Sequence, residues 1–165
     1  MALQQQGHRD TKLRAKRARH TTPSPKQWQK PSLPEEDLQF KFIVPIYEFP
    51  VFFALTSDIG ASIDKLPERL GREIKDRYGD DLDCAGLYSG ADNAYAIIIN
   101  KRDIETLDHE VGHVCQLIMH NIGFDVICGC GETPNDEPLR YLSGWMMNFI
   151  LDKMEKMLKK HNKKD

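Results

Sequence analysis

The sequence predicts a small α+β domain that follows a basic N-terminal arm, and three observations support this fold class. Residues 40–55 and 84–100 are rich in β-branched and aromatic residues, which favour strands. Residues 103–121 and 137–157 repeat apolar side chains every three or four positions, as amphipathic helices do. Residues 1–36 hold few large apolar side chains. We therefore expect a short mixed or antiparallel sheet packed on helix 103–121 and on a C-terminal helix.

The predicted arm spans residues 1–36 and the predicted folded domain spans residues 37–165. Residues 1–34 contain eight Lys or Arg and one acid, a net charge of +7, whereas the remaining residues carry −9. An arm of this composition cannot bury enough apolar surface to offset its conformational entropy. We expect it to be disordered or to become ordered on a partner. Residues 9–30 suit contact with a nucleic acid or an acidic protein surface, and a solvated tail is the alternative.

The four cysteines, Cys84, Cys115, Cys128 and Cys130, form no C-x-x-C pair and are interpreted as free thiols of a reducing cytoplasm. No signal peptide follows Met1, and no apolar run approaches the ~20 residues of a membrane helix. We therefore expect a soluble protein of the cytoplasm, or one built into a particle that assembles inside a cell, without a membrane partner.

The first half of the domain is predicted to contain two short strands, a helix and a hairpin. Pro45 and Pro50 interrupt the β-prone stretch, so it should form edge strands or two strands with a bend. Apolar spacing predicts a helix over 63–78 that Asp64 caps and Gly79 ends. The hairpin should consist of strands 84–88 and 94–100 joined by a turn over 89–93.

Helix 103–121 should bury one face and present another to solvent. Asp103 is its predicted cap and Gly123 its stop. On a helical wheel His109 and His113 lie roughly 150° from the middle of the apolar stripe. That stripe consists of Ile104, Leu107, Val111, Val114 and Ile118. Both histidines are therefore expected to face away from the core.

His109, Glu110 and His113 form the pattern H-E-x-x-H, the spacing of a zinc hydrolase site. Two histidines four residues apart on a helix lie roughly 40° apart, so neutral imidazoles there can share one zinc ion. A Glu directly after the first His can reach a water beside the metal and act as general base. The motif therefore predicts zinc as the cofactor, His109 and His113 as ligands and Glu110 as catalytic base.

A third protein ligand is expected from a carboxylate. The class of zinc site with a third His six positions after His113 is excluded, because position 119 is Met. His120 lies about 10 Å along the helix axis from His113, which is too far for both to bind one metal ion. We therefore expect His120 to be a residue of the cleft or of the surface. Glu132, Asp136 and Glu137 are the candidates. We favour Glu137, because the positive end of the last helix keeps its carboxylate ionised. Glu132 is the alternative ligand. The other interpretation is that Asp136 and Glu137 only cap the helix.

An oxyanion donor and a surface for substrate are the remaining predictions. Tyr141 lies one helical turn after Glu137 and faces the same way, so it is the candidate donor, with packing against the motif helix as the alternative. Strand 94–99 is expected to edge the cleft, where it would pair with an extended peptide, or else to be an ordinary strand of the sheet.

The motif 109–113, followed by Glu137-Pro138-Leu139-Arg140-Tyr141-Leu142-Ser143-Gly144-Trp145, resembles the gluzincin-like metallopeptidases encoded by tailed bacteriophages and prophages. The resemblance spans about residues 95–149 and omits the arm. It implies a zincin-like domain over 37–165, with His109, His113 and Glu137 as zinc ligands and Glu110 as general base. It also implies a location in the host-cell cytoplasm or the virion.

Three functions follow as expectations. The first is a zinc-dependent metallopeptidase that hydrolyses a peptide bond with zinc-activated water. The second is a structural or adaptor protein of a phage neck or tail, whose basic arm docks on neighbouring subunits or DNA. The third is a nucleic-acid-binding regulator that carries the same domain, which requires the arm to bind DNA by itself.

Overall fold

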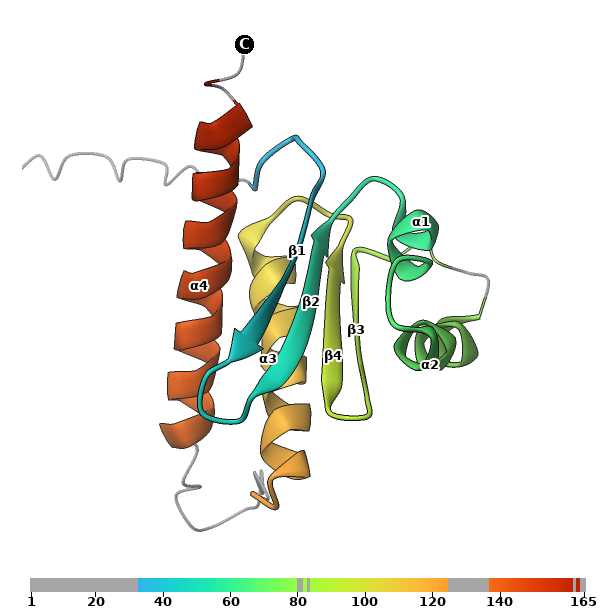
Figure 1. Cartoon of the computed structure of the whole chain (residues 1–165), viewed down its shortest axis with the longest axis vertical. Helices are drawn as coiled ribbons and strands as arrows, with labels where there is room; N and C mark the ends of the chain where they lie inside the picture. Colours follow the sequence, from blue (N-terminus) through green and yellow to red (C-terminus); the bar gives the residue numbers. More distant parts are fainter. Residues whose placement is uncertain (1–32, 80–81, 83, 125–136, 162, 164–165) are drawn as a thin grey trace, which may run out of the picture.

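The computed structural model describes residues 33–79, 82, 84–124, 137–161 and 163. Its centre is a four-stranded mixed sheet in the order β1-β2-β4-β3 (Figure 1). The strands are β1 (Leu38–Val44), β2 (Phe49–Leu55), β3 (Gly86–Ala91) and β4 (Ala94–Ile99). β2 and β4 are parallel, whereas β1 with β2 and β3 with β4 are antiparallel. The predicted α+β class and mixed sheet are confirmed.

The two faces of the sheet carry different helices because alternate side chains point in opposite directions. One face packs against α3 (Ile104–Asn121) and α4 (Glu137–His161). The opposite face packs against α1 (Ile59–Ile63) and α2 (Glu68–Tyr78) (Figure 1). The expected packing of the sheet on the motif helix and the last helix is confirmed, and the second helical layer is an addition.

The strand predictions hold except in two respects, the length of the hairpin turn and the place of strand 94–99 in the sheet. The stretch with two prolines forms β1 and β2, with Pro45 in the turn between them. The hairpin turn is shorter than predicted, since β3 continues to Ala91 and only Asp92 and Asn93, at φ 51° and 58°, make the turn. The prediction that strand 94–99 edges the cleft is wrong. β4 lies inside the sheet because β2 pairs with it on one side and β3 on the other.

Only residues 68–78 of the predicted helix 63–78 form one helix, α2; residue 63 ends a separate short helix, α1, and residues 64–67 lie between the two. Asp58, and not Asp64, is the first N-cap, and its side chain accepts a hydrogen bond from the Ala61 N–H at 2.9 Å. Asp64 ends α1, and Pro67 precedes α2. Gly79 terminates α2 with φ 65°, a conformation that glycine adopts without steric cost. The continuous apolar spacing concealed this break.

Helix α3 matches its prediction closely. Asp103 is the N-cap, and Gly123 follows the helix at φ 77°. Helix α4 begins at Glu137, as expected, and runs antiparallel to α3 (Figure 1). The start of α4 therefore lies beside the C-terminal end of α3. No helix within the described part of the chain is long and apolar enough to cross a membrane.

The described chain starts within the fold. Leu33 is buried, and its N–H donates a hydrogen bond to the carbonyl of Arg102 at 3.2 Å. The Arg102 guanidinium donates in turn to the carbonyls of Pro34 and Glu36 at 2.6 and 2.8 Å. It also pairs with Asp37. Residues 33–36, which were predicted to belong to the arm, are thus tied to the loop before α3, and residues 1–32 lie outside the described chain.

Candidate metal and catalytic site

The first turn of α3 is anchored by its cap. The Asp103 carboxylate accepts a hydrogen bond from the Thr106 N–H at 2.6 Å and forms an ion pair with Lys101 at 2.9 Å. These two contacts lower the pKa of Asp103 to about 2. The turn that leads to the motif is therefore held in place by local interactions.

His109 and His113 are brought together as the spacing predicts. Their Nε2 atoms lie 3.0 Å apart, and the two rings meet edge to face with centroids 4.5 Å apart. His109 is exposed and His113 is partly buried. Two nitrogens this close cannot both carry a proton, so at least one lone pair points at the other ring.

This pair fits a shared metal ion. Two ligands that lie 2.0–2.1 Å from a tetrahedral zinc ion are about 3.3 Å apart, close to the observed 3.0 Å between the two Nε2 atoms. Neutral imidazole is the form that binds zinc. Burial, followed by the charge of His109, lowers the pKa of His113 and so favours that form.

His113 is also held from two other sides. The Tyr88 ring on β3 stacks on the His113 ring at 4.3 Å and 16°. The side chain of Gln116, one turn along α3, hydrogen-bonds His113. Since one ring nitrogen faces His109, the other is the one left for Gln116. These contacts orient the imidazole, and neither residue was singled out as part of the site from the sequence.

Glu110 is buried, with 7% of its surface exposed. It fits because Gly86 on β3 has no side chain: a Cβ there would lie 3.0 Å from Cγ of Glu110. Burial raises the pKa of Glu110, and the nearby His109 opposes that shift. Apart from His109, no described group pairs with this carboxylate. A buried and unpaired carboxylate is costly, which is typical of a residue kept for a ligand or a reaction.

Glu110 and His109 open onto a surface cavity of about 390 Å³, here called the cleft. It lies between the start of β3 and the N-terminal half of α3. Its lining residues are Ala85, Gly86, Lys101, Asp103, Glu105, Thr106, His109 and Glu110. The cleft thus combines a base, one imidazole of the pair and several charged groups.

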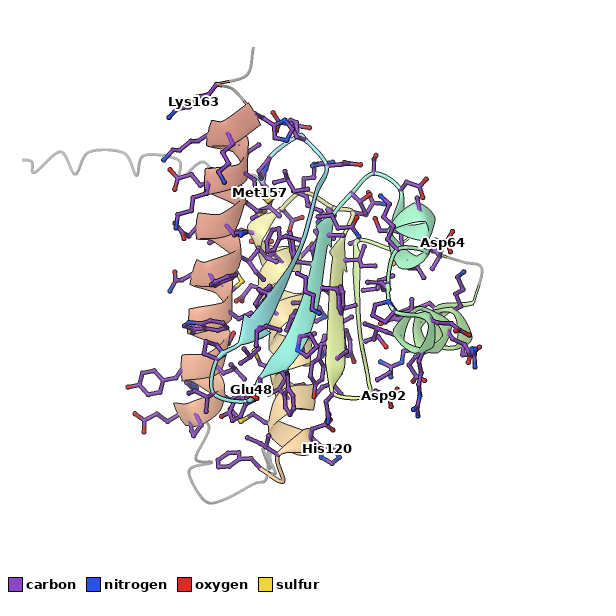
Figure 2. The ribbon with its side chains drawn as sticks, in the orientation of Figure 1. Glu48, Asp64, Asp92, His120, Met157 and Lys163 are labelled. Atoms are coloured by element: carbon purple, nitrogen blue, oxygen red, sulfur yellow. The ribbon has the colours of Figure 1, made fainter. Side chains whose placement is uncertain are left out.

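Glu137 and Tyr141 are not brought to the histidine pair. Both lie in the first turns of α4, beside the C-terminal end of α3, which Figure 2 marks by His120. Tyr141 is 71% exposed and lines a second, apolar cavity of about 510 Å³, here called the hollow. The other residues that line the hollow are Val44, Pro45, Ile46, Tyr47, Pro138, Leu142 and Trp145. The separation has a physical reason: α4 packs on β1 at one edge of the sheet, whereas His113 faces Tyr88 on β3 at the opposite edge.

Among the described residues no group of three His, Cys, Asp or Glu side chains is placed to hold a metal ion. A catalytic zinc needs three protein ligands, and the histidine pair would account for two of them. The other candidates, Glu132 and Asp136, lie outside the described residues, as do Cys128 and Cys130. Of the remaining cysteines, Cys115 is buried, and burial raises its thiol pKa to about 12.

The structure adds Tyr88, Gly86 and Gln116 to the residues predicted from the sequence. A hairpin directly before the motif helix was a signal for a contact between them, but it did not indicate which residues would touch. The assignment of a function must stand on these side chains, because no protein-family model matches the chain and neither the curated proteins nor the solved structures contain a match.

Proposed function

We propose that this protein is a zinc-dependent hydrolase of peptide bonds, with His109 and His113 as metal ligands and Glu110 as general base. One observation carries the proposal: two imidazole nitrogens lie 3.0 Å apart beside a buried, unpaired carboxylate. A purely structural role explains this arrangement poorly, since Glu110 is largely desolvated at the wall of the cleft and no described residue donates a hydrogen bond to it.

The chemistry divides between the metal and the chain. Zinc supplies a Lewis acid that polarises a carbonyl and lowers the pKa of water. The chain supplies Glu110, whose carboxylate accepts a proton from water and returns it to the leaving amine. A raised pKa suits this role, because a base works best when its pKa lies near the working pH. Tyr88 and Gln116 hold His113 in one orientation for the metal.

The third zinc ligand is either Glu137 or Glu132. Glu137 is the ligand that the sequence favours, and binding there requires α4 to start nearer to the histidine pair than it does in this structure. Glu132 is the alternative. A metal titration of Glu137→Gln beside Glu132→Gln separates the two, since loss of one of three ligands weakens zinc binding far more than loss of a surface charge.

The decisive experiment measures zinc stoichiometry in the purified full chain. We expect one zinc per chain for the wild type and little or none for His113→Ala. His120→Ala is the matched control, because this exposed histidine lies on the same helix and should leave zinc unchanged. A wild-type chain that takes up no zinc, or a His113→Ala chain that takes up as much as the control, contradicts the proposal.

Hydrolysis is tested separately with Glu110→Gln and dye-labelled casein. The variant should keep its zinc and lose about 10²–10⁴-fold in rate, the usual contribution of a general base. Equal rates for wild type and variant would remove Glu110 from the mechanism and leave only the metal site.

A second candidate is the structural or adaptor role in a phage particle that the resemblance implies. The observation that favours it is the net charge of residues 1–34, +7, beside −9 for residues 35–165. Truncation of residues 1–32 tests it: partner binding or particle assembly that survives the truncation contradicts this role for the arm.

A further inference from the structure

We propose that the cleft binds a basic peptide segment, and that residues 1–32 of this same chain are one such segment. The description of the cleft as a substrate site rests on the proposed function. The docking itself rests on charge and on where the arm joins the fold.

The cleft carries an excess of acids. Glu105 and Glu110 both line it. Asp103 is a third carboxylate of the lining, and Lys101, which pairs with Asp103, is its one lysine, so acids outnumber lysine there by three to one. Asp108, an exposed acid on α3, lies three residues after Glu105 and directly before His109. The exposed acids Glu105 and Asp108, here called the rim, therefore attract Lys and Arg side chains.

Glu110 is the second, independent indication of a ligand. The residue as a whole is 7% exposed, its side chain lines the cleft, and it has no hydrogen-bond donor among the described residues. A ligand that brings an N–H or ammonium group to the cleft would satisfy it. A peptide with lysine and arginine side chains offers such donors in number.

The arm joins the fold next to a segment that lines the cleft. The Leu33 N–H bonds the carbonyl of Arg102, and Arg102 lies between the cleft residues Lys101 and Asp103. Residues 1–32, which directly precede Leu33, contain eight Lys or Arg and one acid. From Asp103 to His113 helix α3 rises about 15 Å. About five extended residues cover that length, so the arm can reach the whole cleft without leaving its own chain.

Zero-length cross-linking of the full chain tests the docking. A carbodiimide joins lysine amines to carboxylates in direct contact. We expect cross-links from Lys12, Lys16, Lys26 or Lys30 to Glu105 or Asp108, several-fold above those to Glu48 and Asp76. These comparison acids are also exposed, and Glu48 lies at the far end of the sheet (Figure 2). A mixture of isotope-labelled and unlabelled chains shows whether the links form within one chain.

Neutralising the rim provides the matched pair of variants. In Glu105→Gln/Asp108→Asn, trypsin should cleave the arm several-fold faster than in the wild type, because the arm is released. In Glu48→Gln/Asp76→Asn the cleavage rate should stay at the wild-type value. Cross-links spread evenly over all exposed acids, or equal cleavage rates in the two variants, overturn the inference. So does an arm that contacts only added duplex DNA.

The result is independent of the zinc test. Both measurements are made with zinc and with a chelator present. Cross-links without zinc uptake would support binding of basic peptides in the cleft and contradict the zinc hydrolase. Zinc uptake without cross-links would support the metal site and contradict the binding of the arm in the cleft.

Discussion

The cleft and the hollow lie towards opposite ends of the same sheet, and they differ in every property that bears on chemistry. The cleft is lined largely by charged and polar side chains and contains a buried carboxylate beside one of two paired imidazoles. The hollow is lined by aliphatic, aromatic and proline side chains. The single site predicted from the sequence is divided between them, with His109 and Glu110 in the cleft and Tyr141 in the hollow.

The difference shows that the residues sharing one face of a helix can be predicted from the sequence. The residues of another element that this face contacts cannot. The spacing within α3 determines that His109 and His113 come together. Which residues of α4 they meet depends on how α4 packs, and its first turn lies at the other end of α3 (Figure 1). A downstream carboxylate at the start of a helix is therefore a weaker indication of a ligand than two histidines on one turn.

The largest expected effect separates the two faces of α3. Leu107 is fully buried in the core between the sheet and the two long helices. Leu107→Ala should lower the free energy of unfolding by about 2–5 kcal/mol, because it removes apolar contact and leaves a cavity. His109→Ala, two residues away on the exposed face, should change it by about 0.5 kcal/mol or less. Urea unfolding followed by circular dichroism measures both, and equal losses would mean that His109 is a core residue.

The next effect concerns the contact between β3 and α3 that forms the cleft. Gly86→Ala places a Cβ 3.0 Å from both Glu110 Cγ and Thr106 Cγ2, so these neighbours must move. We expect a loss of about 1–3 kcal/mol in the free energy of unfolding. The control is Gly112→Ala, where the new Cβ meets no heavy atom within 4 Å. Alanine should stabilise the helix there by up to about 1 kcal/mol, and a loss at Gly112 as large as at Gly86 would contradict the close approach.

These two glycines indicate which parts of the site were predictable. Signals that act within a few residues were sufficient for α3, since Asp103 caps it and Gly123 ends it, as expected. The burial of Glu110 was not predictable, because it depends on Gly86, 24 positions earlier. The place of β4 inside the sheet depends on the parallel pairing with β2, which is also non-local. Packing between distant segments, and not local propensity, produced every correction at the site.

A smaller effect should appear when the buried carboxylate of the cleft is removed. Glu110→Gln should raise the free energy of unfolding at pH 7 by about 1 kcal/mol, since the amide has no charge to desolvate. Burial raises the pKa of Glu110 above its ordinary 4.5, so the native state holds this proton more tightly than the unfolded state. Wild-type stability should therefore fall as the pH rises from 4.5 through the folded-state pKa.

Below pH 4.5 the carboxyl group is protonated in both states, and the difference between wild type and Glu110→Gln should close. Urea midpoints at several pH values measure this dependence. The control is Glu105→Gln, at an exposed position of the same helix, which should produce a smaller change at pH 7. A constant difference across the whole range would show that Glu110 gains no stability from its proton, and would contradict its burial as a free carboxylate.

The smallest expected effect is in the hollow. Tyr141→Phe removes only a hydroxyl group from a side chain that is 71% exposed and lies beside Val44, Tyr47 and Trp145. Zinc uptake and casein hydrolysis should match the wild type, because this hydroxyl does not reach the histidine pair. A tenfold or larger loss of rate with zinc retained would reinstate Tyr141 as the oxyanion donor. It would also require the first turn of α4 to approach the cleft in the working protein, and Glu137 would then be the ligand to test first.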